Sequence, residues 1–578
     1  MPHDDVISVR AHGAGGNRSF DAIVVGGGLG GCSAAAHLAA LGHKTLLVER
    51  YSILGGSSHV FRRDNEWEFD CGVHYVGDCG PEGEVPRLLR GLGLDEAIGW
   101  LPLDPTRFDT VIAPGLEVRT PADWDRYLIN LEGAFPEDRA GIRRAVGVLR
   151  KLGESLDRTR DTQSYGRFAA AMGRAGWAAP YAFLPYVALL VRCGLSPRTI
   201  LAMSVQNGAL ASTPETLSTL GHAIFLQNYV GGGAYYPRGG GQTLAAGFAA
   251  VIRANGGEIS TNTTVARIRT EGGSVIGVEL TGGRHLDAPI VVSDLDPVRT
   301  FRDLVGTENL SRRLRLRSRS WTMSKPLING FFGVAMDLSD IPNTNYFAIP
   351  DLSVADSLMS LKRFGERTAG GKGHRDGEAW ARDFARSQPM FVQSSSRRDP
   401  DYRRAAPLGH GTVEVQTLAP YRPDLWGFDG YDVADREYKR NKQYQRVKEI
   451  VLDGMLERME QAIPGSSSRV LISELGTPAT QERYVGNTGG APFGLAYTPT
   501  QMGPMRPGPA TSIQGLYLVG TSTPSGPATQ GAMVSGQIAA GIIVGRDLNA
   551  EVRAGASIHR GEKIDVSSVS ADALRASH

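Results

Sequence analysis

The chain contains little cysteine, almost no net charge and no long apolar run. Its four cysteines in 578 residues form no C-x-x-C pair, which argues against a dithiol redox centre or a zinc site. The absence of a disulfide framework predicts a reducing, cytoplasmic location. A net charge of +2 is too balanced to indicate nucleic-acid binding. No stretch is long enough to cross a bilayer.

The two ends and the isolated histidines also lack recognisable signals. Residues 1–18 have no apolar core flanked by basic residues, so a disordered leader is predicted instead of a signal peptide. Residues 549–578 are polar and are predicted to form a flexible tail. His222 and His285 have no partners at metal-ligand spacing, and no metal is predicted. The apolar stretch 181–191 indicates a buried helix or, alternatively, a membrane-facing or substrate-tunnel helix, which leaves peripheral membrane attachment open.

The strongest pattern is a strand, a glycine-rich turn and a helix near the N-terminus. An apolar strand at 21–25 leads into a loop that satisfies G-x-G-x-x-G, and an Ala-rich helix at 32–41 follows. A second strand at 45–48 ends in the acidic residue Glu49. This order is that of a complete βαβ unit, which predicts that the chain binds a dinucleotide, either FAD or NAD.

Residues of this unit have separate physical tasks. Gly26 allows the tight turn, Gly28 lets the backbone approach a pyrophosphate, and Gly31 lets the helix pack against the strand. The pyrophosphate would lie on the free N–H groups of the helix, and Glu49 would accept hydrogen bonds from the adenosine ribose. Arg50 is either a contact at the adenosine or pyrophosphate edge or a solvated surface residue. The predicted cofactor contacts here are Gly26, Gly28, Leu29, Gly30, Gly31, Glu49 and Arg50.

Three features favour FAD over NAD. A Gly-Gly pair about six residues past Glu49 resembles flavoproteins of the two-dinucleotide-binding-domain superfamily. No other G-x-G-x-x-G follows an apolar strand. The C-terminal segment 515–536 resembles the closing strand and helix of that superfamily, where the helix N-terminus faces the flavin and stabilises negative charge. The added predicted contacts are Gly55, Gly56, Ser57, Ser58, Gly520, Thr521, Thr529, Gln530 and Ala532.

A second motif, residues 69–77, reads F-D-x-G-x-H-Y-x-G. It resembles the phytoene desaturase, carotenoid isomerase and retinol saturase group, and most closely the retinol saturase branch. Segments 232–240, 412–421 and 477–487 resemble the same group, so the similarity covers roughly residues 20–545. Thr521 is a departure, because the superfamily often has an aspartate there that binds the ribityl chain; a threonine offers one uncharged hydroxyl.

The resemblance implies an α/β fold, the Rossmann-like two-dinucleotide-binding-domain flavoprotein fold. A discontinuous FAD-binding domain and an interleaved α+β substrate domain are expected. Paired glycines at 272–273 and 282–283 predict hairpin turns, and the backbone near Val265 would contact the adenine. The charged stretch 362–386 is interpreted as an exposed insertion. The expected FAD-binding pieces are 19–80, 236–298 and 511–548, and the substrate pieces are 81–235 and 299–510.

The resemblance also places Gly72, Val73 and His74 beside the isoalloxazine ring. His74 would either transfer a proton or position the flavin by a hydrogen bond. Tyr75 is the second catalytic candidate, with a structural role as its alternative. Asp70 is expected to cap or hydrogen-bond backbone near the flavin. Residues expected to line an apolar tunnel, or else to be ordinary core, are Phe183, Leu184, Val187, Leu190, Phe331 and Phe332.

The implied activity is an FAD-dependent oxidoreductase acting on carbon–carbon bonds of an apolar isoprenoid or polyene, carotenoid- or retinoid-like. Hydride transfer at flavin N5 would make it a saturase, a desaturase or a cis–trans isomerase. One alternative is an amine oxidase, whose usual aromatic pair near the C-terminus has only Phe493 and Tyr497 as candidates. Another is a non-catalytic FAD-bound protein of a lipid pathway. The expected electron partners are a quinone, O₂, a partner reductase or NAD(P)H.

Overall fold

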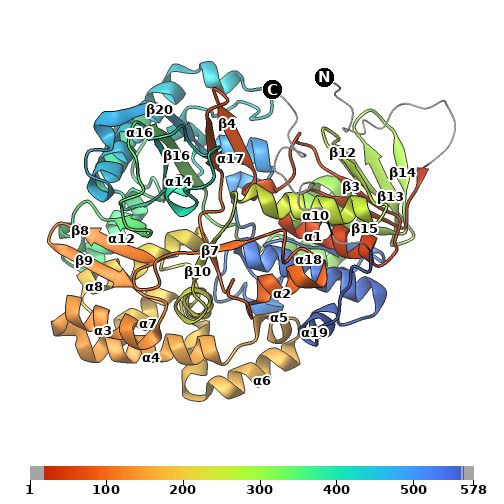
Figure 1. Ribbon diagram of the computed structural model, residues 1–578, viewed down its shortest axis with the longest axis horizontal. Coiled ribbons are helices and arrows are strands. Elements are labelled where there is room, and N and C mark those ends of the chain that lie inside the picture. The colour runs from red at the N-terminus through yellow and green to blue at the C-terminus, as the bar shows by residue number, and fades with distance from the viewer. Residues whose placement is uncertain (1–17, 562–563, 565–578) are drawn as a thin grey trace.

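The computed structural model describes residues 18–561 and residue 564. The predicted leader, apart from its last residue, and most of the predicted tail lie outside the described residues. Two large sheets organise the fold, one to the right and one to the upper left in Figure 1, with a helical region below the second.

The first large sheet is parallel and holds the predicted βαβ unit. Its strands are short and apolar, and their pairing is parallel throughout. They come from three separate stretches of the chain, so this layer is discontinuous in sequence. In spatial order the strands are β11 (Glu258–Ser260), β3 (Thr45–Val48), β2 (Ala22–Val25), β15 (Ile290–Ser293) and β21 (Leu516–Leu518).

Helices cover one face of the parallel sheet, and a small four-stranded sheet, antiparallel except for the β1–β14 pair, covers the other. The helices are α1 (Leu29–Ala40), α10 (Gln242–Ala254) and α18 (Ala528–Val544), with α1 in contact with both others. The predicted hairpin turns at 272–273 and 282–283 are confirmed, since all four glycines have positive φ between neighbouring strands. The small sheet contains β1 (Arg18–Ser19), β14 (His285–Asp287), β13 (Ser274–Leu280) and β12 (Val265–Glu271).

The second large sheet is mixed and forms one wall of the functional site. Its outer face packs against α13 (Gly377–Ser387) and α16 (Lys442–Ala462) in a core that includes Trp380 and Phe384. Its strands, in spatial order, are β20 (Val470–Gly476), β16 (Leu327–Val334), β19 (Gly411–Leu418), β18 (Met390–Gln393), β17 (Asn345–Ala348), β8 (Asp109–Ala113) and β9 (Leu116–Thr120).

The helical region lies beneath the second sheet (Figure 1) and shares one apolar core with strands of that sheet. It holds the stretch predicted to be a buried helix, where α7 buries Tyr186, Leu189 and Leu190. The principal helices are α3 (Trp124–Ala134), α4 (Arg139–Glu154), α6 (Tyr165–Ala175), α7 (Tyr186–Arg192), α8 (Pro197–Ser204) and α9 (Thr219–Leu226).

Smaller elements connect these parts. A three-stranded sheet links the parts of the fold that are built on the two large sheets, and a hairpin leads into the second motif, residues 69–77. These strands are β6 (Val76–Gly77), β10 (Ala234–Pro237), β7 (Trp100–Pro102), β4 (Val60–Arg63) and β5 (Trp67–Asp70). The shorter helices are α2 (Glu84–Gly91), α5 (Arg158–Asp161), α11 (Arg312–Ser318), α12 (Leu358–Arg367), α14 (Ser395–Arg398), α15 (Pro423–Trp426), α17 (Pro478–Val485) and α19 (Leu548–Arg553).

Two sequence-based expectations need correction. The stretch 362–386 is not an exposed insertion as a whole, because Trp380 and Phe384 on α13 are completely buried. The predicted tail is folded at its start, where α19 packs on α18 and α2 and buries Val552. Both predictions were wrong because each stretch is mostly polar but contains a few apolar residues that the fold buries. Among residues 18–561 and 564, no helix combines the length and apolar character that a membrane span requires.

Candidate active site

The glycine-rich turn between β2 and α1 has no room for a side chain. Gly26 has φ of +101°, in the left-handed region that favours glycine. A Cβ atom on Gly31 would lie 2.1 Å from the Gly26 carbonyl oxygen, and one on Gly28 would lie 2.4 Å from Oδ2 of Asp294. The turn can therefore approach a ligand through its backbone alone.

Asp294 supports this turn from the neighbouring strand. It directly follows β15, and its carboxylate accepts hydrogen bonds from the backbone N–H groups of Gly28 and Gly31. Burial raises the pKa of the Asp294 carboxyl to about 7. Asp294 was not predicted, although an acidic residue immediately after an apolar strand was an available signal.

Glu49 lies at the end of β3, as the βαβ pattern requires. Its carboxylate accepts hydrogen bonds from the Gly27 N–H at 2.7 Å and the Tyr51 N–H at 2.6 Å. Burial raises the pKa of the Glu49 carboxyl. The neighbouring Arg50 donates to the Arg483 carbonyl oxygen at 2.6 Å, which connects β3 to α17.

A cavity of about 770 Å³ lies above the glycine-rich turn. Most predicted cofactor residues line it, but Gly31, His74 and Gln530 do not. Gly31 packs beneath the turn, His74 lines the second cavity and Gln530 lines a third, of about 50 Å³. The predicted residues that line the large cavity are Gly26, Gly28, Leu29, Gly30, Glu49, Arg50, Gly55, Gly56, Ser57, Ser58, Gly72, Val73, Val265, Gly520, Thr521, Thr529 and Ala532.

This cavity fits FAD by shape and by chemistry. A glycine cradle that a Cβ would fill faces it on one side, with the half-buried acid Glu49 close by. The first turn of α18 reaches it from the other side through Thr529 and Ala532, so a second helix N-terminus faces the ligand. Ala528, at the start of α18, holds φ of +72°, a strained conformation of the kind found at ligand sites.

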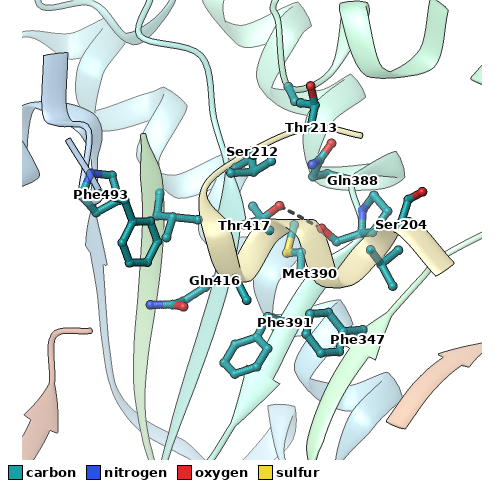
Figure 2. A pocket seen from close by; sticks show the side chains of 18 of the residues that line it. Ser204, Ser212, Thr213, Phe347, Gln388, Met390, Phe391, Gln416, Thr417 and Phe493 are labelled. Atoms are coloured by element: carbon teal, nitrogen blue, oxygen red, sulfur yellow. Dashed lines mark hydrogen bonds between the residues drawn. The ribbon is translucent and has the colours of Figure 1, made fainter. Parts of the chain in front are cut away.

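A second, mostly apolar cavity of about 220 Å³ adjoins the first (Figure 2). Strands of the mixed sheet form one wall, including Phe391 and Phe347, and residues of α8 and α12 also line the cavity. The two cavities share lining residues, so they lie side by side. The shared residues are Ser57, Gly72, Pro492, Phe493, Ala528 and Thr529.

His74 lines the second cavity with both ring nitrogens in contact with glutamines. Its Nδ1 lies 2.9 Å from Gln393 Nε2, and its Nε2 lies 2.6 Å from Gln416 Nε2. Arg398 donates to Gln393 Oε1, which directs the Gln393 N–H groups towards His74. His74 Nδ1 therefore accepts a hydrogen bond from Gln393, and the neutral ring carries its proton on Nε2. That proton needs the amide oxygen of Gln416 as its acceptor, so the Gln416 amide has to present its oxygen to His74 in place of its nitrogen. Burial, with a smaller effect of Arg398, lowers the pKa of His74 to about 3.

Behind His74 lies a buried polar network that the sequence analysis did not predict. Glu414 accepts hydrogen bonds from Gln393 Nε2 at 2.5 Å and from Ser395 Oγ at 3.2 Å. Burial raises the pKa of the Glu414 carboxyl to about 8. Asp70 accepts from Tyr236 and from the Gly241 N–H at the start of α10, as expected of a backbone-binding residue. Together with the His74 contacts, they join the second motif to the mixed sheet, to β10 of the three-stranded sheet and to the start of α10.

Tyr75 also lines the second cavity, and its hydroxyl donates to Asp109 Oδ2 at 3.5 Å. Asn345 Nδ2 and Gln206 Nε2 donate to the same carboxylate at 2.6 and 2.8 Å. Burial raises the pKa of Asp109 to about 6, although these hydrogen bonds oppose the shift. Burial also raises the pKa of Tyr75 well above its ordinary value, so its hydroxyl keeps its proton.

The predicted tunnel residues do not line this cavity. Phe332 and Leu190 are core residues, and Phe183 is 45% exposed. Instead, the stretch interpreted as an insertion contributes lining residues through α12, including Phe364. Among the described residues, no group of three or more His, Cys, Asp or Glu side chains could hold a metal ion.

One family model matches about half of the chain, and several relatives match most of it. Residues 29–315 match the family described as flavin containing amine oxidoreductase. All-trans-retinol 13,14-reductase of Danio rerio is 25% identical, over 87% of this chain and 82% of the relative. Prolycopene isomerase of Arabidopsis thaliana is 27% identical, over 88% of this chain and 80% of the relative.

Solved structures agree in fold. An oxidoreductase from Methanosarcina mazei has a TM-score of 0.55 at 18% identity and covers 89% of this chain and 98% of its own. Putrescine oxidase bound to putrescine has a TM-score of 0.59 at 12% identity, with 91% and 99% coverage. The predicted fold class is thus confirmed. The family match, the fold and the cavity identify the chain as an FAD-dependent oxidoreductase, and the relatives confirm its resemblance to the phytoene desaturase, carotenoid isomerase and retinol saturase group.

Proposed function

We propose that the protein acts on a carbon–carbon double bond of an apolar polyene, of carotenoid or retinoid type. The observation that carries the proposal is the mostly apolar cavity that adjoins the cofactor cavity and shares six lining residues with it. Relatives named as a retinol reductase and prolycopene isomerases support it. When bound, FAD supplies hydride chemistry at its ring. The chain itself must bind the polyene, exclude water and manage one proton.

The lining residues suit an uncharged substrate. Phe347, Met390 and Phe391 form an apolar wall on the mixed sheet. His74 is neutral because burial holds its pKa at about 3, so it adds no charge to the cavity. We propose that His74 positions the cofactor-facing end of the substrate site through its two glutamine contacts, and does not act as the acid.

Tyr75 is the proposed proton-handling residue. Tyr75 lines the cavity, and its hydroxyl carries a proton and is hydrogen-bonded to the buried Asp109. In a reduction, Tyr75 would give that proton to a substrate carbon and regain one from Asp109. With a pKa of about 6, the Asp109 carboxyl exchanges protons close to neutral pH.

The amine oxidase alternative receives less support. Phe493 lines the cofactor cavity, but Tyr497 does not. The ring centroid of Tyr497 lies 5.2 Å from the guanidinium carbon of Arg506, and Tyr497 lines the third cavity, of about 50 Å³. Among the described residues that line the second cavity, the proposed substrate site, the only carboxylate is that of Glu215, which is exposed. A cationic amine inside would lack a counter-charge, which is unfavourable in an apolar site.

We also propose that the cavity opening faces an anionic membrane surface. Helix α12 lines the cavity with Phe364 and exposes Leu358 and Met359 by 43% and 56%. Lys362 and Arg363 are exposed on the same helix. Basic and apolar side chains together favour an interfacial position, from which an apolar substrate could enter. Flotation with phosphatidylserine vesicles tests this; equal recovery with neutral vesicles would contradict it.

The decisive experiment is anaerobic flavin spectroscopy of the purified protein with a panel of carotenoids and retinoids. Reoxidation of the dithionite-reduced protein by a polyene would indicate a saturase, and bleaching of the oxidised protein a desaturase. Isomerised product without net flavin change would indicate an isomerase. No response in either state, together with bleaching by amines, would overturn the proposal. Adding a quinone, O₂ or NAD(P)H afterwards identifies the electron partner.

A further inference from the structure

The second cavity, which we call the substrate cavity, contains buried polar atoms that no group of the described residues satisfies. Ser204 Oγ, Asn329 Oδ1 and Gln388 Oε1 line it or belong to residues that line it, and none has a hydrogen-bond partner within the part of the chain that the structure describes. These residues are only 7%, 2% and 7% exposed. Buried polar atoms in native proteins are almost always hydrogen-bonded, so orphaned atoms at a cavity wall point to a ligand.

Two of the three lie away from the cofactor. Gln388 stands between α13 and β18, and Ser204 ends α8. Neither lines the cofactor cavity, whereas Phe493 lines both cavities. Figure 2 shows Gln388 and Ser204 together on the side opposite Phe493. Asn329 is different, because its Nδ2 donates to the Cys71 carbonyl oxygen beside Gly72, at the cofactor end.

Neighbouring polar groups at this end are already satisfied. Thr417 Oγ1 donates to the Pro389 carbonyl oxygen at 2.8 Å, and Ser212 Oγ donates to the Leu210 carbonyl oxygen at 3.0 Å. The unsatisfied atoms are therefore not a general property of this wall. Among the described residues that line the cavity at the end away from the cofactor, only Gln388 and Ser204 carry such unsatisfied atoms.

We propose that Gln388 and Ser204 form a polar subsite that binds a hydroxyl group of the substrate. A hydroxyl can donate to Gln388 Oε1 and accept from Ser204 Oγ at the same time. A carboxylate or a ketone has no proton to donate, so it does not pair with Gln388 Oε1 in the amide orientation of this structure. Among the described lining residues no Lys or Arg is present to neutralise an anion.

The inference rests on the proposed function and narrows its substrate class to isoprenoid alcohols, as opposed to pure hydrocarbons. A hydroxyl held at the far end would also fix the register of the chain, so that one particular double bond reaches the wall shared with the cofactor cavity. Sites built to bind a substrate hydroxyl discriminate strongly against analogues that lack it, because the buried polar groups are then left unpaired.

The test compares retinol with the deoxy hydrocarbon of the same skeleton, by equilibrium dialysis against the oxidised holoenzyme under anaerobic conditions. We expect retinol to bind at least about tenfold more tightly. In Gln388→Met and in Ser204→Ala, the preference should fall towards one while the affinity for the hydrocarbon stays unchanged. Ser466→Ala is the matched control, since Ser466 Oγ is also buried and without a partner among the described residues but lines none of the three cavities.

Equal affinity for the two ligands in the wild type, or an unchanged preference in both variants, would overturn the subsite. Retention of alcohol preference without any electron exchange with the flavin would uphold the subsite and overturn the proposed function. Absence of binding by either ligand would overturn both. Thermal melting of each variant shows that the comparison is made on folded protein.

Discussion

His74 Nδ1 lies 2.9 Å from Gln393 Nε2, and this contact joins the loop between β5 and β6 to the mixed sheet. His74 belongs to the second motif, beside the cofactor cavity, and Gln393 belongs to the mixed sheet, which forms one wall of the substrate cavity. The two residues are 319 positions apart in the sequence. The junction of the two cavities is therefore held by a side-chain contact that no local pattern could have predicted.

His74→Ala should leave FAD bound but lower turnover by at least about tenfold, because Gln393 and Gln416 would lose their shared partner. His74 does not line the cofactor cavity, so flavin content per protein should remain close to one. Turnover on the best polyene and the flavin absorbance together measure the effect. Unchanged turnover would show that the His74 contacts are structural only.

The same substitution should change the pH dependence of stability. The pKa of His74 falls from 6.5 to about 3 on folding, so the unfolded chain binds more protons between these pH values. This contribution is fully present above pH 6.5 and is lost as pH falls towards 3. Urea unfolding of His74→Ala should therefore show a shallower loss of stability between pH 6.5 and pH 4, by up to about 1.4 kcal/mol per pH unit. His37 and His222, whose pKa values are also lowered, remain in both proteins.

Gly28→Val should abolish FAD binding. A branched side chain would enter the place reserved for the pyrophosphate, and its Cβ would lie 2.4 Å from Asp294 Oδ2. The purified variant should be colourless. Gly133→Ala is the control, because Gly133 is exposed on α3 with no atom within 4 Å of an added Cβ. A yellow Gly28→Val protein would contradict the assignment of the turn.

The nucleotide-binding half of the fold follows from local sequence, whereas the substrate half does not. Glycine spacing and apolar strands placed the βαβ unit because their effects act within about thirty residues. Asp294 and Gln416 were missed, since they reach the site through strand neighbours distant in sequence. The error over α13 was avoidable: Trp380 and Phe384 are four residues apart, the spacing of one buried helix face.

Asp294→Ala should weaken FAD binding by about tenfold to a hundredfold, because the N–H groups of Gly28 and Gly31 would lose their acceptor. Asp294→Asn keeps one acceptor oxygen of the same shape and should be less affected. FAD dissociation constants of the two reconstituted variants distinguish these outcomes. Equal and unaltered affinities would show that the turn is held by its glycines alone.

Arg506→Met should destabilise the protein by about 3 kcal/mol. The Arg506 side chain is 1% exposed and donates to backbone carbonyl oxygens that flank the approach to α18. The accepting residues are Leu495, Ala496, Gln501, Thr521 and Thr523. Urea unfolding measures the loss, with Arg312→Met on the exposed surface of α11 as the control. A change no larger than the control would contradict a structural role for this buried guanidinium.

Tyr75→Phe should separate proton transfer from binding. The ring stays at the cavity wall, but the hydroxyl that donates to Asp109 is lost. If the reaction is a reduction, its single-turnover rate should fall by about a hundredfold or more, while the polyene dissociation constant changes little. Asp109→Asn keeps the size of the side chain but cannot return a proton. Its rate should fall as well, and the pH dependence near 6 should disappear. A Tyr75→Phe protein that reacts at the wild-type rate would show that the proton comes from elsewhere, with the buried Glu414 carboxyl, of pKa about 8, as the next group to test.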